Sequence, residues 1–147
     1  MREGAAGSSG PALLWPLLLY TGASLWHFAH NAIYIDAYPN LPTSLSAARV
    51  WLAWAALASL GALGFLLLRS GRRSLGLVIV GVYGLLGFDG LAHYALAPVG
   101  DHTLVMNLTI WGEAFAAAVL LIATLRCMSE MRGGVGPSGP GAPTREN

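Results

Sequence analysis

The sequence contains a single cysteine, no lysine and few charged residues of either sign. Because Cys127 has no possible partner within the chain, an intramolecular disulfide and a cysteine-rich zinc site are both excluded. The basic residues are all arginine, and the formal net charge of +1 excludes a nucleic-acid binder that works by neutralising phosphates. Charged residues make up only 10% of the chain and hydrophobic residues 55%, which excludes an ordinary soluble domain.

Long apolar runs dominate what is present, and a helix needs roughly 20 mostly apolar residues to cross a bilayer. Four runs predict membrane spans, at residues 11–35, 47–68, 75–97 and 103–126. We therefore expect an all-α polytopic membrane protein, folded as an antiparallel four-helix transmembrane bundle over residues 11–128. The low-complexity ends, residues 1–10 and 129–147, are predicted to be disordered tails.

The placement of arginine predicts the orientation of these spans. One arginine, Arg49, lies on one side, and the others fall on the side of both termini and the second loop: Arg2, Arg69, Arg72, Arg73, Arg126, Arg132 and Arg145. By the positive-inside rule, both termini are cytoplasmic and the first and third loops face outward. The predicted location is a bacterial inner membrane or its equivalent, with the lipid bilayer as a partner.

The four histidines all fall in the predicted outer halves of the spans, at His27, His30, His93 and His102. On the first span, His27 shares a helical stripe with other polar residues, namely Tyr20, Ser24, Asn31 and Tyr34. Asp89 and His93 have the i, i+4 spacing that stacks two side chains on one helix face. His102 lies in a short loop and is predicted to be solvated.

Two carboxyl groups, those of Asp89 and Glu113, are predicted to lie within the bilayer near these histidines. An ionised carboxylate there costs a few kcal/mol or more unless it is paired, protonated or bound to metal. We therefore expect a cluster of histidine and carboxylate side chains near the outer mouth of the bundle.

Imidazole and carboxylate together, without thiolate, are typical ligands of copper, zinc or iron. The sequence predicts His27, His30, Asp89 and His93 as metal ligands, with Glu113 as the catalytic proton acceptor or a further ligand. The order Asp89, three residues, His93 and then His102 resembles the metal-binding run in the C subunit of copper membrane monooxygenases over one short segment. The expected chemistry is redox or hydrolytic, on a lipophilic small molecule.

Two alternatives use the same residues. A haem b is typically held between histidines on two helices, here His27 or His30 with His93. Without a cofactor, Asp89 and Glu113 with the histidines form a proton relay in a small transporter or accessory membrane subunit. The sequence also leaves open whether the chain forms a homodimer or binds a partner membrane subunit.

Overall fold

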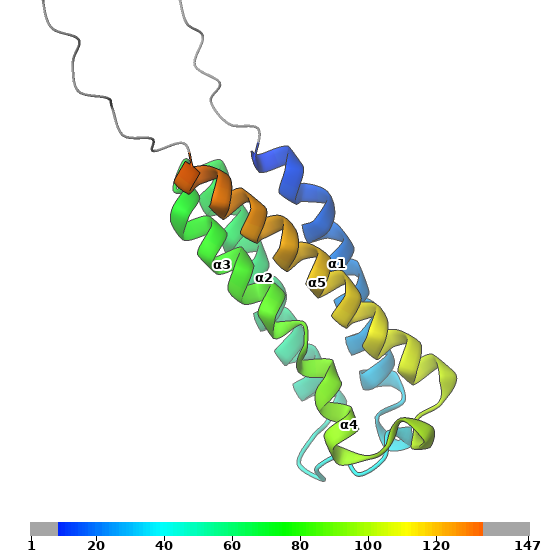
Figure 1. Cartoon of the computed structure of the whole chain (residues 1–147). Coiled ribbons are helices and arrows are strands. Elements are labelled where there is room, and N and C mark those ends of the chain that lie inside the picture. The colour runs from blue at the N-terminus through cyan, green and yellow to red at the C-terminus, as the bar shows by residue number, and fades with distance from the viewer. Residues whose placement is uncertain (1–8, 134–147) are drawn as a thin grey trace, which may run out of the picture.

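The computed structural model describes residues 9–133, which contain helices and no strand. Four long helices lie side by side along most of the molecule (Figure 1). They are α1 (Ser9–Ile33), α2 (Ala47–Arg69), α3 (Arg73–Leu86) and α5 (Leu104–Gly133). Short helices occupy one end, namely η1 (Ile35–Ala37), η2 (Asp89–Ala92), α4 (His93–Leu96) and η3 (Val99–Asp101).

Each long helix contacts two others, because α1 packs against α2 and α5, and α3 also packs against α2 and α5. The start of α1 and the end of α5 lie together at one end, which we name the terminal end (Figure 1). We name the opposite end, where η1, α4 and η3 lie, the histidine end.

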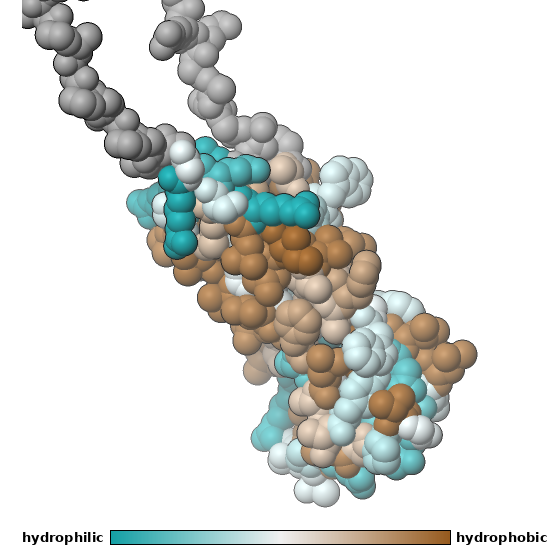
Figure 2. Space-filling model, in the orientation of Figure 1, coloured by the Kyte–Doolittle hydropathy of each residue, from teal (hydrophilic) through white to brown (hydrophobic). Residues whose placement is uncertain are grey.

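Three helical segments are long and apolar enough to cross a membrane, judged by length and composition: Ala47–Arg69, Arg73–Leu96 and Leu104–Gly133. Figure 2 shows a brown, hydrophobic surface around the middle of the molecule, with hydrophilic side chains at both ends. Helix α1 is not among these three segments of the described residues. The predicted first span therefore stays a prediction.

The helix boundaries depart from the predicted ones in two places. Helix α5 continues through residues 127–133, so residues 129–133 are helical and were wrongly predicted as part of a disordered tail. The predicted third span is not one regular helix, because α3 ends at Leu86 and the chain continues through η2 into α4. The rest of both predicted tails lies outside the described residues.

Small residues bring α2 and α3 close together, as helix packing in lipid requires. A Cβ at Gly61 would lie 2.5 Å from the ring of Tyr83, and one at Gly64 would lie 2.8 Å from Val80. Between the two helices Gly71 has a positive φ of 83°, which allows the chain to turn directly from α2 into α3.

Apolar packing fills the terminal end and the middle of the molecule. One core cluster contains Leu13, Leu77 and Cys127. The larger one lies next along the helices and consists of Leu17, Tyr20, Val80, Tyr83, Ala116, Ala117 and Leu120. The predicted site residues all lie beyond these clusters, toward the histidine end.

Candidate functional site

A column of buried polar side chains runs along one face of α1. Its members Tyr20, Ser24, His27 and Asn31 follow one another at intervals of four, three and four residues, so they stack on one face. All four are buried, and Asn31, the most exposed, retains only 8% of its accessible surface. The predicted stripe is therefore confirmed up to Asn31, whereas Tyr34 lies beyond the end of α1 and is exposed.

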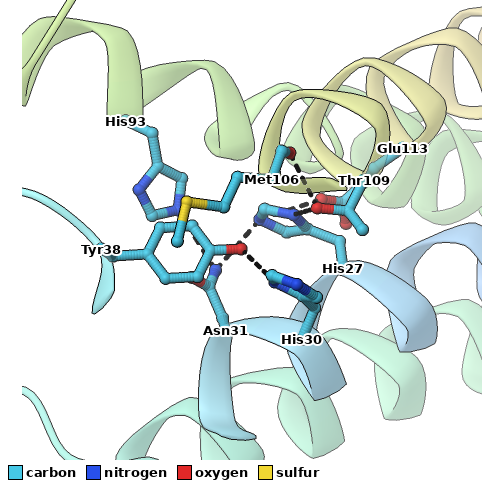
Figure 3. A network of polar contacts seen from close by, with 8 residues as sticks. All are labelled: His27, His30, Asn31, Tyr38, His93, Met106, Thr109 and Glu113. Atoms are coloured by element: carbon cyan, nitrogen blue, oxygen red, sulfur yellow. Dashed lines mark hydrogen bonds and ion pairs between the residues drawn. The ribbon is translucent and has the colours of Figure 1, made fainter. Parts of the chain in front are cut away.

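Glu113 on α5 faces this column and has no accessible surface. Its Oε2 atom lies 3.7 Å from Nε2 of His27 (Figure 3). That distance is too long for a hydrogen bond, and neither carboxyl oxygen has a hydrogen-bond partner among the described residues. A buried carboxyl group in this position is an exception to the rule that buried polar atoms are paired.

The hydrogen bonds of His27 decide which of its ring nitrogens carries the proton. The Thr109 hydroxyl donates its single hydrogen to the Met106 carbonyl at 2.9 Å, so it accepts from Nδ1 of His27 at 3.2 Å. Nδ1 therefore carries the proton, and Nε2 is left with a lone pair. Nε2 accepts a hydrogen bond from the Asn31 amide at 3.1 Å, and Oε2 of Glu113 is a second acceptor 3.7 Å from the same atom.

Asn31 joins two imidazoles that come from different helices. Its amide nitrogen donates to Nε2 of His27 and to Nε2 of His93, each at 3.1 Å (Figure 3). The centroids of the two rings lie 5.5 Å apart. The amide oxygen of Asn31 has no partner within the described residues. Sequence reasoning placed Asn31 on the correct face but did not assign it to the site.

The break between α3 and α4 lets η2 pass close to this group. A Cβ at Gly90 would lie 3.2 Å from Oε2 of Glu113 and 3.4 Å from Nε2 of His27. A Cβ at Gly87 would overlap the ring of Tyr20, and one at Gly90 would fit only if Glu113 shifted by a few tenths of an ångström.

The same break changes the position of Asp89. Because η2 is a 3₁₀ helix, Asp89 and His93 do not stack as an i, i+4 pair of a regular α-helix, and that prediction was wrong. Asp89 is exposed and lines a pocket beside α2, whereas His93 reaches Asn31.

His30 points away from His27 and contacts the loop after α1. Its Nδ1 is hydrogen-bonded to the hydroxyl of Tyr38 at 2.9 Å, and its ring lies 4.6 Å from that of Tyr34 (Figure 3). Tyr38 is buried, and its ring lies 4.9 Å from that of His93. Burial raises the pKa of Tyr38 to about 12, so its hydroxyl keeps its proton near neutral pH.

His102 is buried, so its prediction as a solvated loop residue was wrong. Its Nδ1 donates to the carbonyl of Pro98 at 3.1 Å, while Nε2 has no partner among residues 9–133. Its ring lies 6.1 Å from that of His93. His102 and Tyr38 therefore cover His93 on the side of the loops, and no sequence spacing indicated that either would do so.

The structure thus brings together His27, His93 and Glu113, while His30 is hydrogen-bonded to Tyr38 and Asp89 lines a pocket that it shares with His27. Within the described part of the chain, no group of three or more His, Cys, Asp or Glu side chains is arranged to hold a metal ion. The predicted metal site is not observed as a preformed set of ligands. What the arrangement does provide is a buried acid beside a buried imidazole lone pair.

Comparison with known proteins adds no family to this picture, because no family model, curated protein or solved structure matches the chain.

Proposed function

We propose that this chain is a polytopic membrane protein, folded as an antiparallel four-helix bundle with cytoplasmic termini, in which His27 and Glu113 form a proton-exchange site. The site serves proton-coupled transport of a solute. Three helices apolar enough to cross a membrane and the hydrophobic surface in Figure 2 support the membrane setting. The arginine distribution supports the orientation.

One observation carries the proposal: Glu113 is fully buried, has no hydrogen-bond partner among the described residues, and lies 3.7 Å from Nε2 of His27, which is itself a hydrogen-bond acceptor. A bare negative charge there is opposed by the loss of solvation. A proton on Glu113 removes this charge and leaves the hydrogen bond from Asn31 to His27 intact, whereas a proton on Nε2 of His27 requires the Asn31 donor to move away. The pair is therefore arranged to hold one proton that can leave when the surroundings change.

The position of the polar column indicates the side of the membrane with which this proton exchanges. From Tyr20 to Asn31 the column rises about 16 Å at 1.5 Å per residue, roughly half of a 30 Å hydrocarbon core. Beyond it, toward the terminal end, the core cluster of Leu13, Leu77 and Cys127 is apolar. This arrangement supports proton exchange with the histidine end, on the predicted outer side, while the terminal half stays closed.

The test is proton exchange by the intact protein reconstituted in lipid vesicles. A pH step on the side of the histidine end is expected to give a proton uptake that Glu113→Gln abolishes. Glu130→Gln is the matched control, because Glu130 is the same residue type on the same helix but is exposed. Equal uptake by wild type and Glu113→Gln, with both proteins folded, would contradict the proposal.

A divalent transition metal is the second candidate, and the hydrogen bonds of His27 favour it. With Nδ1 fixed by Thr109, Nε2 presents its lone pair as metal-bound histidines do. Two ligand atoms about 2.1 Å from a shared tetrahedral ion lie about 3.4 Å apart, close to the observed 3.7 Å. Because the Asn31 amide donates to Nε2 of both His27 and His93, a metal ion held by either imidazole would have to displace it. Copper, zinc or iron content that is lost in His27→Ala would select this candidate.

The haem b alternative has less support. An iron shared by His27 and His93 would lie between their Nε2 atoms, and the Asn31 amide nitrogen occupies that position, 3.1 Å from each. Chemistry on a lipophilic small molecule, a homodimer and a partner subunit stay predictions.

A further inference from the structure

A pocket of about 150 Å³ lies beside the His27–Glu113 pair, between α1, α2 and η2. It is lined by His27, Phe28, Asn31, Leu45, Arg49, Val50, Ala53, Asp89 and Gly90. A cavity of this size holds a molecule of about six non-hydrogen atoms, or the volume of about five waters. Of these lining residues, only His27 belongs to the proposed proton-exchange pair.

Two opposite charges line this pocket without neutralising each other. Arg49 comes from the first turn of α2 and Asp89 from η2, and the described residues contain no ion pair between them. The Arg49 guanidinium is held in place by a hydrogen bond to the carbonyl of Ser44. Both side chains are exposed, so they stand at the opening of the pocket and are free to meet a ligand.

The inner wall adds a buried acceptor. Asn31 is 92% buried, lines the pocket, and has an amide oxygen without a partner in the described part of the chain. A buried acceptor without a partner is stabilised by a ligand that brings a hydrogen-bond donor. The remaining wall is apolar and is formed by Phe28, Leu45 and Val50.

We propose that this pocket binds a compact zwitterion, with its ammonium group toward Asp89 and the Asn31 oxygen and its carboxylate or phosphate toward Arg49. Guanidinium binds both kinds of acidic group through paired hydrogen bonds. A free small amino acid and the ethanolamine phosphate of a lipid headgroup share this chemistry. The inference rests on the proposed function, since it names the class of solute that the proton accompanies.

Gly90 provides the link between ligand and proton. It lines the pocket, and a Cβ there would come within 3.4 Å of His27 Nε2 and 3.2 Å of Glu113 Oε2. Only a glycine separates the ligand from the proton-holding pair at this point. A charged group bound in the pocket therefore acts on that pair over a short distance in a poorly hydrated setting.

The experiment measures binding to the intact protein in nanodiscs made of phosphatidylcholine. The probes are alanine and O-phosphoethanolamine, compared with acetate and methylamine, which each carry one of the two charges. Both zwitterions are expected to bind at least about tenfold more tightly than either single-charge probe, since each single-charge probe lacks one of the two hydrogen bonds to a charged group. Preference for O-phosphoethanolamine, and loss of alanine binding when phosphatidylethanolamine is added to the nanodisc, would identify the lipid source. Preference for alanine in both membranes would identify a free solute.

Variants at the rim are expected to fold, because both charged residues are exposed. Arg49→Gln and Asp89→Asn should each weaken zwitterion binding by about tenfold or more. Arg69→Gln is the matched control, since Arg69 is exposed at the other end of the same helix. Ala53→Leu, which places a larger side chain in the pocket wall, should also reduce binding.

Two results would overturn the inference: equal affinity for alanine and acetate, or rim variants that bind as wild type does. The proton-exchange proposal fails separately. If zwitterions bind but Glu113→Gln leaves proton uptake on binding unchanged, the pocket stands and the role of Glu113 does not. If proton uptake depends on Glu113 but no zwitterion binds, the role of Glu113 stands and the zwitterion pocket does not.

Discussion

The two halves of this molecule differ in whether their buried polar atoms have hydrogen-bond partners. In the terminal half and the middle, the buried hydroxyl of Thr124 donates to the carbonyl of Leu120 and that of Tyr83 is hydrogen-bonded to Thr21, so within the described residues Tyr20 is the one buried hydroxyl there without a partner. Apolar side chains fill the rest of this region. Toward the histidine end, buried polar atoms lack partners among the described residues on Ser24, Asn31, His93, His102 and Glu113. We infer that the first region holds the helices together and that the second retains unpaired groups for a ligand or a proton.

The largest expected effect tests the apolar half. Leu120 is fully buried in the main core cluster, and Leu120→Ala should lower the free energy of unfolding by about 2–3 kcal/mol. This loss lies at the low end of the range for buried leucines in soluble proteins. In lipid the truncated side chain loses packing contacts, but the hydrophobic effect does not add to the loss. Reversible unfolding in mixed detergent measures the change, with the exposed Leu125→Ala as control. Equal losses in the two variants would remove the distinction between core and lipid-facing positions.

The second prediction concerns the boundary between the halves. In Gly87→Ala the new Cβ would overlap the Tyr20 ring, with an expected cost of about 1–3 kcal/mol. Gly81→Ala is the matched control, because its Cβ would lie 3.7 Å from a methyl group of Thr124, at ordinary contact distance. The same unfolding measurement applies, and a stable Gly87→Ala protein would show that η2 does not need to approach α1 so closely.

The third prediction tests whether Asn31 organises the two imidazoles. Asn31→Ala leaves Nε2 of His27 and of His93 without a donor, so we expect a loss of about 1–2 kcal/mol. Nitrogen NMR of the histidine rings should show that the tautomers of His93 become mixed, whereas His27 keeps its proton on Nδ1 through its hydrogen bond to Thr109. Ring signals unchanged from wild type would mean that other contacts fix the imidazoles.

The smallest effect is expected at the loop that covers the site. Tyr38→Phe removes the hydrogen bond to His30 and should cost about 1 kcal/mol, whereas the exposed Tyr34→Phe should cost little.

Tyr38 also predicts a dependence on pH. Because burial raises the pKa of Tyr38 from 10.0 to about 12, folding favours the neutral phenol. Its contribution to stability is complete below about pH 10 and is lost as the pH rises toward about 12. Stability measured across that window should fall more steeply for wild type than for Tyr38→Phe. An equally steep fall in stability for wild type and Tyr38→Phe would show that Tyr38 does not cause the loss of stability at high pH.

The sequence predicts the helices well, because long apolar runs are a local signal. It also places His27 and Glu113 correctly, since a polar residue inside an apolar run must face protein and the depths of the two agree. The break after Leu86 was not predictable in this way. It depends on contacts of Gly87 and Gly90 with residues of other helices, which no local pattern records.

The burial of Tyr38 and His102 over the site was not predicted, for a related reason. Tyr38 and His102 lie in short loops, where helical spacing no longer says which way a side chain points. Their burial depends on how the loops fold back over His93. Asp89 was misplaced because the prediction assumed a continuous α-helix through η2.

The role of Glu113 as the proton-holding group is tested most directly by infrared difference spectroscopy of the intact protein in lipid, recorded between acidic and alkaline buffer. The account predicts a protonated-carboxyl band in wild type that changes with pH, shifts in deuterated water, persists in Glu130→Gln and disappears in Glu113→Gln. The same band in Glu113→Gln would show that the proton is held elsewhere.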